Sequence, residues 1–279
     1  MFSLLIAAAV SILVVVALLA AQIHTGTTVF FGIVALLAAY YLVGYLVRRK
    51  IKAVQNDLQA ILVGGQQRIS RKIQQVQGKP GVNIKLLQRQ IESDQKNIFR
   101  EALEYTKRFE PLKRWNLLMG RQIATMRLQF LYQLKEFEQV DELLASRGLF
   151  KGPLLMEPMS VAMKMARQYK NGDMAGVEKT FKRHVKWFRG SRGTLLYALM
   201  SWIQVKQGET EKARLLLQDA KESTGDETLT YNWERLCNNK PKSFSNAGLG
   251  DEWYGLYLEN PPAPKQQRVR GNQFKGRGF

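Results

Sequence analysis

Cysteine, histidine and recognisable catalytic motifs are scarce in this chain of 279 residues. Cys237 is the only cysteine, so no intrachain disulfide can form and a cysteine-based metal site is excluded. The two histidines, His24 and His184, stand in different parts of the chain, and neither has a carboxylate relay nearby in sequence. A nucleophile elbow, a glycine-rich nucleotide fingerprint and a zinc-binding helix motif are all missing. We therefore expect no metal and no other cofactor, and we predict that the chain is not an enzyme.

Acidic residues are also few. The chain has 23 of them against 42 lysines and arginines, which gives a formal net charge of +19. Such an excess of positive charge predicts an anionic partner, either lipid headgroups or nucleic acid. The plainer alternative is that these cations only hold a cytoplasmic domain beside an anionic leaflet, where each is worth about 1 kcal/mol.

What the chain does have is two long apolar runs at its start, Phe2 to Ala21 and Val29 to Val47, neither with a charged residue. A bilayer core about 30 Å thick needs roughly 20 apolar residues in a helix. We therefore predict that residues 1–47 form a transmembrane helical hairpin. A cleaved signal peptide is the alternative for the first run, but this run has no basic start and exceeds the usual length.

The orientation of this hairpin follows from the charges beside it. Four of the five residues in the cluster 48–52 are basic, and such clusters resist translocation and stay on the cytoplasmic side. The linker between the two runs is short and polar, as expected for the turn of a hairpin. Both termini are therefore predicted to face the cytoplasm, in an integral membrane protein.

Residues 48–110 are predicted to form a helical stalk that could self-associate as a coiled coil. Apolar residues at helical spacing extend the second membrane helix until Gly64-Gly65 interrupts it. A short helix is expected over 66–77, a turn over 78–81, and a long helix from about Ile84 to Phe109. The apolar stripe of the long helix is typical of a core or a coiled-coil seam.

Residues 111–259 show paired helices that recur about every 36 residues. In the clearest pair, Gly208 ends the first helix, Ala213 follows five positions later in the second, and Leu217 fills the next large apolar position. This pattern resembles the tetratricopeptide repeat, a helix-turn-helix unit of about 34 residues that stacks into solenoids. The resemblance implies an all-α solenoid. Apolar residues at Leu229, Trp233 and Leu236 predict a terminal helix over 226–238 that could cap the stack.

Two earlier pairs repeat the arrangement. The nearer one has Gly172 at its turn, followed by Val177 in place of the usual alanine and by Phe181. The other turns at Lys135, where a glycine is expected, and continues through Val140. Turns at even spacing favour a repeat over a chance alignment of amphipathic helices.

The order of these parts, a membrane anchor followed by cytoplasmic repeats, is similar to HemY-type membrane-anchored tetratricopeptide proteins of bacteria. This resemblance implies a scaffold in the bacterial inner membrane whose repeats bind another protein. The first helices of the pairs are expected to line the groove for this partner. The predicted contact residues are Gln122, Arg127, Lys164, Gln168, Met200 and Gln204.

A membrane-tethered protein that binds nucleic acid or ribosomes is the alternative, because two segments are strongly basic. Residues 260–279 form a proline-rich linker and a tail predicted to be disordered, in which arginine, glycine and phenylalanine alternate. A second basic segment surrounds Trp187, with cations around most of its helix. The predicted contacts with an anionic partner, which could also be the lipid bilayer, are Lys182, Arg183, Lys186, Arg189, Arg192, Arg268, Arg270, Lys275 and Arg277.

Overall fold

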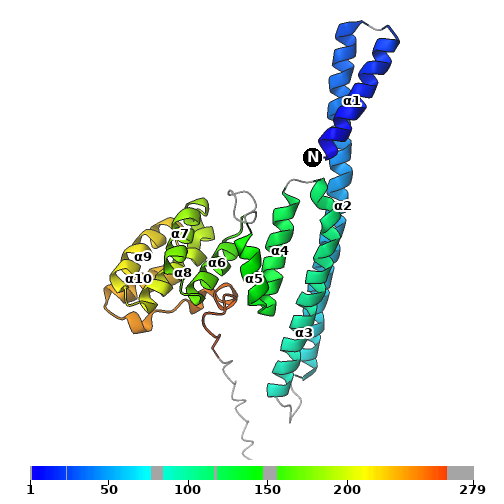
Figure 1. Ribbon diagram of the computed structural model, residues 1–279. Coiled ribbons are helices and arrows are strands. Elements are labelled where there is room, and N and C mark those ends of the chain that lie inside the picture. The colour runs from blue at the N-terminus through cyan, green and yellow to red at the C-terminus, as the bar shows by residue number, and fades with distance from the viewer. Residues whose placement is uncertain (1, 23, 77–83, 116–117, 147–155, 263–279) are drawn as a thin grey trace, which may run out of the picture. The chain divides into compact units, whose positions relative to one another are not determined.

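The computed structural model describes residues 2–22, 24–76, 84–115, 118–146 and 156–262. All regular secondary structure in these ranges is helical, which confirms the all-α prediction (Figure 1). The α-helices are α1 (Phe2–Ala20), α2 (Thr25–Val76), α3 (Ile84–Tyr105), α4 (Met119–Leu134), α5 (Phe137–Ala145), α6 (Pro158–Lys170), α7 (Met174–His184), α8 (Thr194–Lys206), α9 (Thr210–Thr224), α10 (Glu227–Cys237) and α11 (Asp251–Tyr254). The 3-10 helices are η1 (Thr106–Arg114), η2 (Val185–Trp187), η3 (Gly190–Gly193), η4 (Pro241–Ser243) and η5 (Ala247–Leu249).

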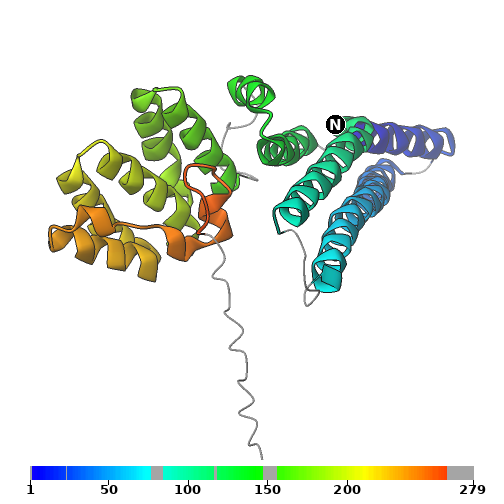
Figure 2. The ribbon, with the colours of Figure 1, turned by 90° about the horizontal axis from the view of Figure 1, so that it is seen from below.

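The chain forms two compact units, residues 1–167 and residues 168–279, which divide within α6. In the first unit, α1 lies along the N-terminal part of α2 (Figures 1 and 2). The two helices approach closely at Gly32, whose carbonyl accepts a hydrogen bond of 2.7 Å from the Ser11 hydroxyl. A Cβ atom on Gly32 would lie 2.6 Å from a methyl group of Val15. A small residue is therefore required at this crossing.

Apolar side chains cover the outer surface of α1 and of the first half of α2, and most of them are exposed. By length and composition, α2 could cross a membrane, and no other helix in the described ranges meets that test. The apolar part of α1, Leu4–Ala20, is shorter. The exposure argues against a core helix of a water-soluble domain, since such a helix would bury these side chains.

The predicted break at Gly64-Gly65 is wrong, because α2 continues through both glycines to Val76. Each glycine costs a helix interior only about 1 kcal/mol, and Gly65 has a packing role that offsets this cost. It is buried against Ile98 of α3, and a Cβ atom there would lie 2.6 Å from two atoms of that side chain. The glycine thus lets α3 approach α2 rather than ending the helix.

The core of the first unit lies between α2, α3, η1 and α4. Buried residues of α2 recur every seven positions at Ile51, Leu58 and Gly65, the period of a coiled-coil seam. Ile51 and Leu58 belong to one core cluster with Ala102 of α3 and Phe109 of η1, both fully buried, whereas Gly65 lies against Ile98. The second half of α2, which begins with the basic cluster, is therefore a structural element of a packed unit.

The long helix predicted to reach Phe109 ends earlier, at Tyr105, and continues as η1. Pro111 lies inside η1, and it disfavours an α-helix there because it has no backbone N–H to donate and its ring clashes with the carbonyl four residues earlier. The tighter 3-10 geometry still buries Phe109 completely. The turn predicted over 78–81 lies outside the described residues.

In the second unit, α8 contacts both α7 and α9, and α10 packs against α9 (Figures 1 and 2). Small buried residues on facing helices, Ala198 and Ala213, allow α8 and α9 to approach closely. The helix predicted over 226–238 is α10, and Asp226 caps its start by accepting a hydrogen bond from the Leu229 N–H at 3.1 Å.

Candidate interaction surfaces

Three helix pairs, α4–α5, α6–α7 and α8–α9, are joined by turns of the same geometry. Each turn contains one residue with positive φ: Lys135 at 61°, Gly172 at 77° and Gly208 at 81°. Its N–H donates to the carbonyl three residues earlier, and the next N–H donates to the carbonyl five residues earlier, at 2.8 to 3.1 Å. This is the Schellman motif, which strongly favours glycine at the position of positive φ. Lys135 adopts it without glycine, at a cost of about 1 kcal/mol.

An acidic residue follows the Schellman position in all three turns and begins the second helix. Its carbonyl accepts the N–H four residues later, at 3.0 to 3.1 Å. The three acceptors are Glu136, Asp173 and Glu209, and the three donors, all buried, are Val140, Val177 and Ala213. Phe181 and Leu217, one turn further on, are also buried. The residues taken to define the repeat thus occupy equivalent places in two pairs of helices.

The predicted partner contacts on the first helices differ in accessibility. Gln122 on α4 and Lys164 on α6 are half-buried and reach the surface. Arg127 donates to the Thr106 hydroxyl at 3.0 Å and pairs with Glu110 at 2.8 Å, so it holds η1 against α4.

The other three predicted contact residues, Gln168, Met200 and Gln204, are bonded or buried within the second unit. Gln168 accepts a hydrogen bond of 2.9 Å from the Thr180 hydroxyl of α7. Met200 and Gln204 on α8 are buried, with 5% and 9% of their surfaces exposed. A partner could reach these two side chains only if the unit opened. The first helix of the third pair therefore offers no open groove at these positions.

The C-terminal segment covers part of α8. Trp253, which is fully buried, packs edge-on against Trp202 of α8 with ring centroids 5.6 Å apart. The indole N–H groups of both tryptophans donate to the Glu259 carboxylate, each at 2.8 Å. Asn246 is also fully buried, and its amide donates to the Ala198 carbonyl at 2.9 Å. The aromatic segment 251–258 was expected to dock back on the helix pairs, and Trp253 does so. The clamp that Glu259 forms with both tryptophans, and the contact of Asn246, were not predicted.

The predicted basic residues of the second unit are all exposed, at the end of α7 and in the segment 185–193, which contains η2 and η3. They are Lys182, Arg183, Lys186, Arg189 and Arg192. Beneath them Phe188 is buried, and the guanidinium group of Arg192 lies 5.4 Å from the centre of its ring. His184 is also buried, and its Nδ1 atom lies 2.7 Å from the Thr180 carbonyl. The cations thus stand on a well-packed base.

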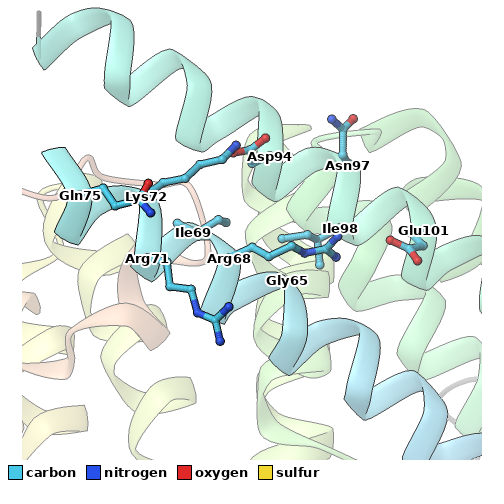
Figure 3. A pocket seen from close by; sticks show the side chains of 10 residues that line it. All are labelled: Gly65, Arg68, Ile69, Arg71, Lys72, Gln75, Asp94, Asn97, Ile98 and Glu101. Carbon is cyan, nitrogen blue, oxygen red and sulfur yellow. The ribbon is translucent and has the colours of Figure 1, made fainter.

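A cavity of about 440 Å³ lies between α2 and α3 of the stalk (Figure 3). Arg68, Arg71 and Lys72 line it from α2, and Asp94 and Glu101 line it from α3. Figure 3 shows Lys72 reaching across to Asp94, with which it forms an ion pair, while Arg71 points away from α3. The charges of the two helices therefore partly neutralise each other.

Two pKa shifts in the first unit follow contacts between side chains. A hydrogen bond from Lys113 lowers the pKa of Glu110, and the charge and hydrogen bond of Arg127 lower it further. Burial, together with a hydrogen bond to Asp57 at 2.8 Å, raises the pKa of Tyr105. Lys113 lies in η1 with Glu110, Arg127 joins η1 to α4, and the Tyr105–Asp57 bond joins α3 to α2. These shifts therefore reflect structural contacts rather than a reactive centre.

Among the described residues, no group of three or more histidine, cysteine, aspartate or glutamate side chains could hold a metal ion. The tail residues Arg268, Arg270, Lys275 and Arg277 lie outside the described residues. No family model, no curated protein and no solved structure matches this chain.

Proposed function

We propose that this protein is a membrane-anchored adaptor whose cytoplasmic helical repeats, of the tetratricopeptide type, bind a partner protein. The observation that carries the proposal is the single helix α2. Its first half exposes apolar side chains, and its second half forms part of the core of the first unit. A rigid connection of this kind would hold the helical units close to a bilayer.

The repeat character is supported by the three Schellman turns, which recur about every 36 residues and are each followed by an acidic residue. Helix pairs of this period are the building blocks of solenoids, which bind peptides and proteins on extended surfaces. We place the contact surface on α4 and α6, at Gln122 and Lys164, because the equivalent positions of α8 are buried. The adaptor needs no catalytic residue and no cofactor.

The anchor is tested with Cys237, which is exposed on α10 and is the only cysteine. In cells, a membrane-impermeant maleimide is expected to label Cys237 only after the inner membrane is opened. The matched control is His24→Cys in the Cys237→Ser background, which is expected to react in intact inner membranes because His24 precedes α2 in the predicted outer turn. Release of the protein by alkaline carbonate, or the opposite labelling pattern, would disprove the anchor or its orientation.

Partner binding is tested by crosslinking the full chain in its own membranes and comparing wild type with the Gln122→Glu, Lys164→Glu double variant. The expected result is a discrete protein that survives nuclease treatment and is lost in the variant. Recovery of the same proteins from both chains would contradict the adaptor. Partners that vanish after nuclease treatment would favour the nucleic-acid or ribosome-binding alternative.

A further inference from the structure

The end of α7 carries a cationic face opposite its buried face. Buried residues of this helix lie at 177, 180, 181 and 184. The exposed cations Lys179, Lys182, Arg183 and Lys186 repeat the same spacing two positions later, with Lys186 just beyond the helix in η2. Two residues turn a helix by about 200°, so these cations project away from the core. They do not surround the helix, as the sequence had suggested, but gather on one side.

Arg189 and Arg192, both exposed, follow within eight residues of the end of the helix, and we call the six cations the basic surface. No acidic residue occurs between Lys179 and Gly208 in the sequence. Glu178 precedes the basic surface and pairs with Lys182 at 3.1 Å. Even with this pair, the exposed side chains of the segment carry a large excess of positive charge. The basic surface therefore attracts an anion-rich partner.

The aromatic residues within this segment favour anionic lipid headgroups over single-stranded RNA or DNA as the partner. Binding to single strands relies on aromatic faces that are open for base stacking. Here Phe188 is buried beneath Arg192, and Trp187 is half-buried with its ring against that of His184, 5.0 Å between centroids. The basic surface thus offers charge without a stacking platform.

We propose that the basic surface binds the anionic headgroups of the bilayer in which the chain is anchored, and so gives the second unit its own membrane contact. This inference rests on the proposed anchor, which keeps the basic surface at a high effective concentration near lipid. At about 1 kcal/mol per cation, the loss of three cations should lower the ratio of docked to undocked units about 100-fold.

The test uses the full chain in liposomes of phosphatidylcholine alone or mixed with phosphatidylglycerol. A fluorophore is attached at Ser191→Cys in the Cys237→Ser background, because Ser191 is exposed within the segment of the basic surface. The control label sits on the native Cys237 of α10. Quenching by a water-soluble quencher then reports whether each label is covered by the membrane.

Covering of the Ser191→Cys label is expected only in the anionic liposomes, with loss at high salt and no change at Cys237. The Lys182→Gln, Lys186→Gln, Arg189→Gln variant should lose this protection. A matched variant, Lys170→Gln, Lys240→Gln, Lys242→Gln, removes as many exposed cations elsewhere in α6 and near α10 and should keep it.

Equal quenching in both kinds of liposome, or protection that survives in the basic-surface variant, would overturn the proposal while leaving the anchor intact. Protection in neutral liposomes by added RNA or DNA, with none from phosphatidylglycerol, would assign the basic surface to nucleic acid and would also overturn it. Extraction of the unlabelled chain from liposomes by carbonate would overturn the anchor together with this inference.

Discussion

Replacing each of the two adjacent glycines of α2, Gly64 and Gly65, by alanine is expected to change stability in opposite directions. Both are interior helical residues, so either substitution should stabilise the helix itself by about 1 kcal/mol. At Gly64 nothing lies within 4 Å of the new Cβ atom, and this gain should be realised in full. At Gly65 the Cβ atom would lie 2.6 Å from the Cδ1 and Cγ1 atoms of Ile98 and 2.9 Å from Cγ2.

Contacts this short force Ile98 or the whole of α3 to shift. Overpacking of this kind costs about 1 to 3 kcal/mol. The helix gain of about 1 kcal/mol offsets part of this cost. Gly65→Ala should therefore destabilise the α2–α3 pair by zero to about 2 kcal/mol. The two alanine variants should differ by about 1 to 3 kcal/mol although they are neighbours in sequence.

The assay is hydrogen exchange of the backbone amides in α3, measured by mass spectrometry on the full chain in liposomes, because exchange reports local opening. Gly64→Ala should slow exchange in α2 and leave α3 unchanged or slower, whereas Gly65→Ala should speed exchange in α3 by up to about 30-fold. Adding Ile98→Val, which removes one contacting methyl group, should reduce the penalty. Equal effects of the two alanine variants would refute the close approach of α3 at Gly65.

Three further contacts give testable expectations. Gly32→Leu should loosen α1 from α2 because Val15 lies against Gly32, whereas Gly44→Leu, with no atom within 4 Å, should not; exchange in α1 distinguishes them. Glu259→Gln should cost about 1 to 3 kcal/mol in thermal unfolding, since one acceptor of the two indole N–H groups is lost, and an unchanged melting temperature would contradict the clamp. The lowered pKa of Glu110 means that its ion pairs stabilise the fold above the unfolded value of 4.5 and are lost as pH falls through the lower folded value. Because that side chain is 38% exposed, Glu110→Gln should destabilise by under about 1 kcal/mol near neutral pH and by nothing in strong acid, as thermal melts at both pH values would show.

Local signals in the sequence predicted the helices and turns well. Gly172 and Gly208 are found at positive φ, as expected for helix ends, and the acidic residues after them begin new helices. The same reasoning failed at Gly64-Gly65, because a glycine read in isolation cannot be told from one that admits a neighbouring helix. The difference lies in Ile98, which is distant in sequence.

The sequence predicted the candidate surfaces less well than the helices and turns. The cations of α7 were found from composition, but their arrangement on one face required the buried positions to be known. Met200 and Gln204 were expected at a groove because first helices line it in repeats of this kind, yet both are buried. The docking of the aromatic segment 251–258 on α8 was expected from its composition. The hydrogen bond from Trp202 to Glu259, 57 residues later, was not, because no local pattern encodes such a contact.

The way the second unit ends explains why α8 is covered. At the end of α10, Asn239 adopts φ 52°, and the N–H groups of Asn239 and Lys240 make the same pair of Schellman bonds, at 3.0 and 2.8 Å, as in the three earlier turns. Lys240 stands where an acidic residue began a helix in the earlier turns, and only a 3-10 turn, which starts at Pro241, forms after it. The residues after it then carry Asn246 and Trp253 onto α8, where a further helix pair would otherwise protect the apolar surface. The segment held by Glu259 covers this face of α8, so a partner of the proposed adaptor would have to use the outward faces of the helices in the second unit.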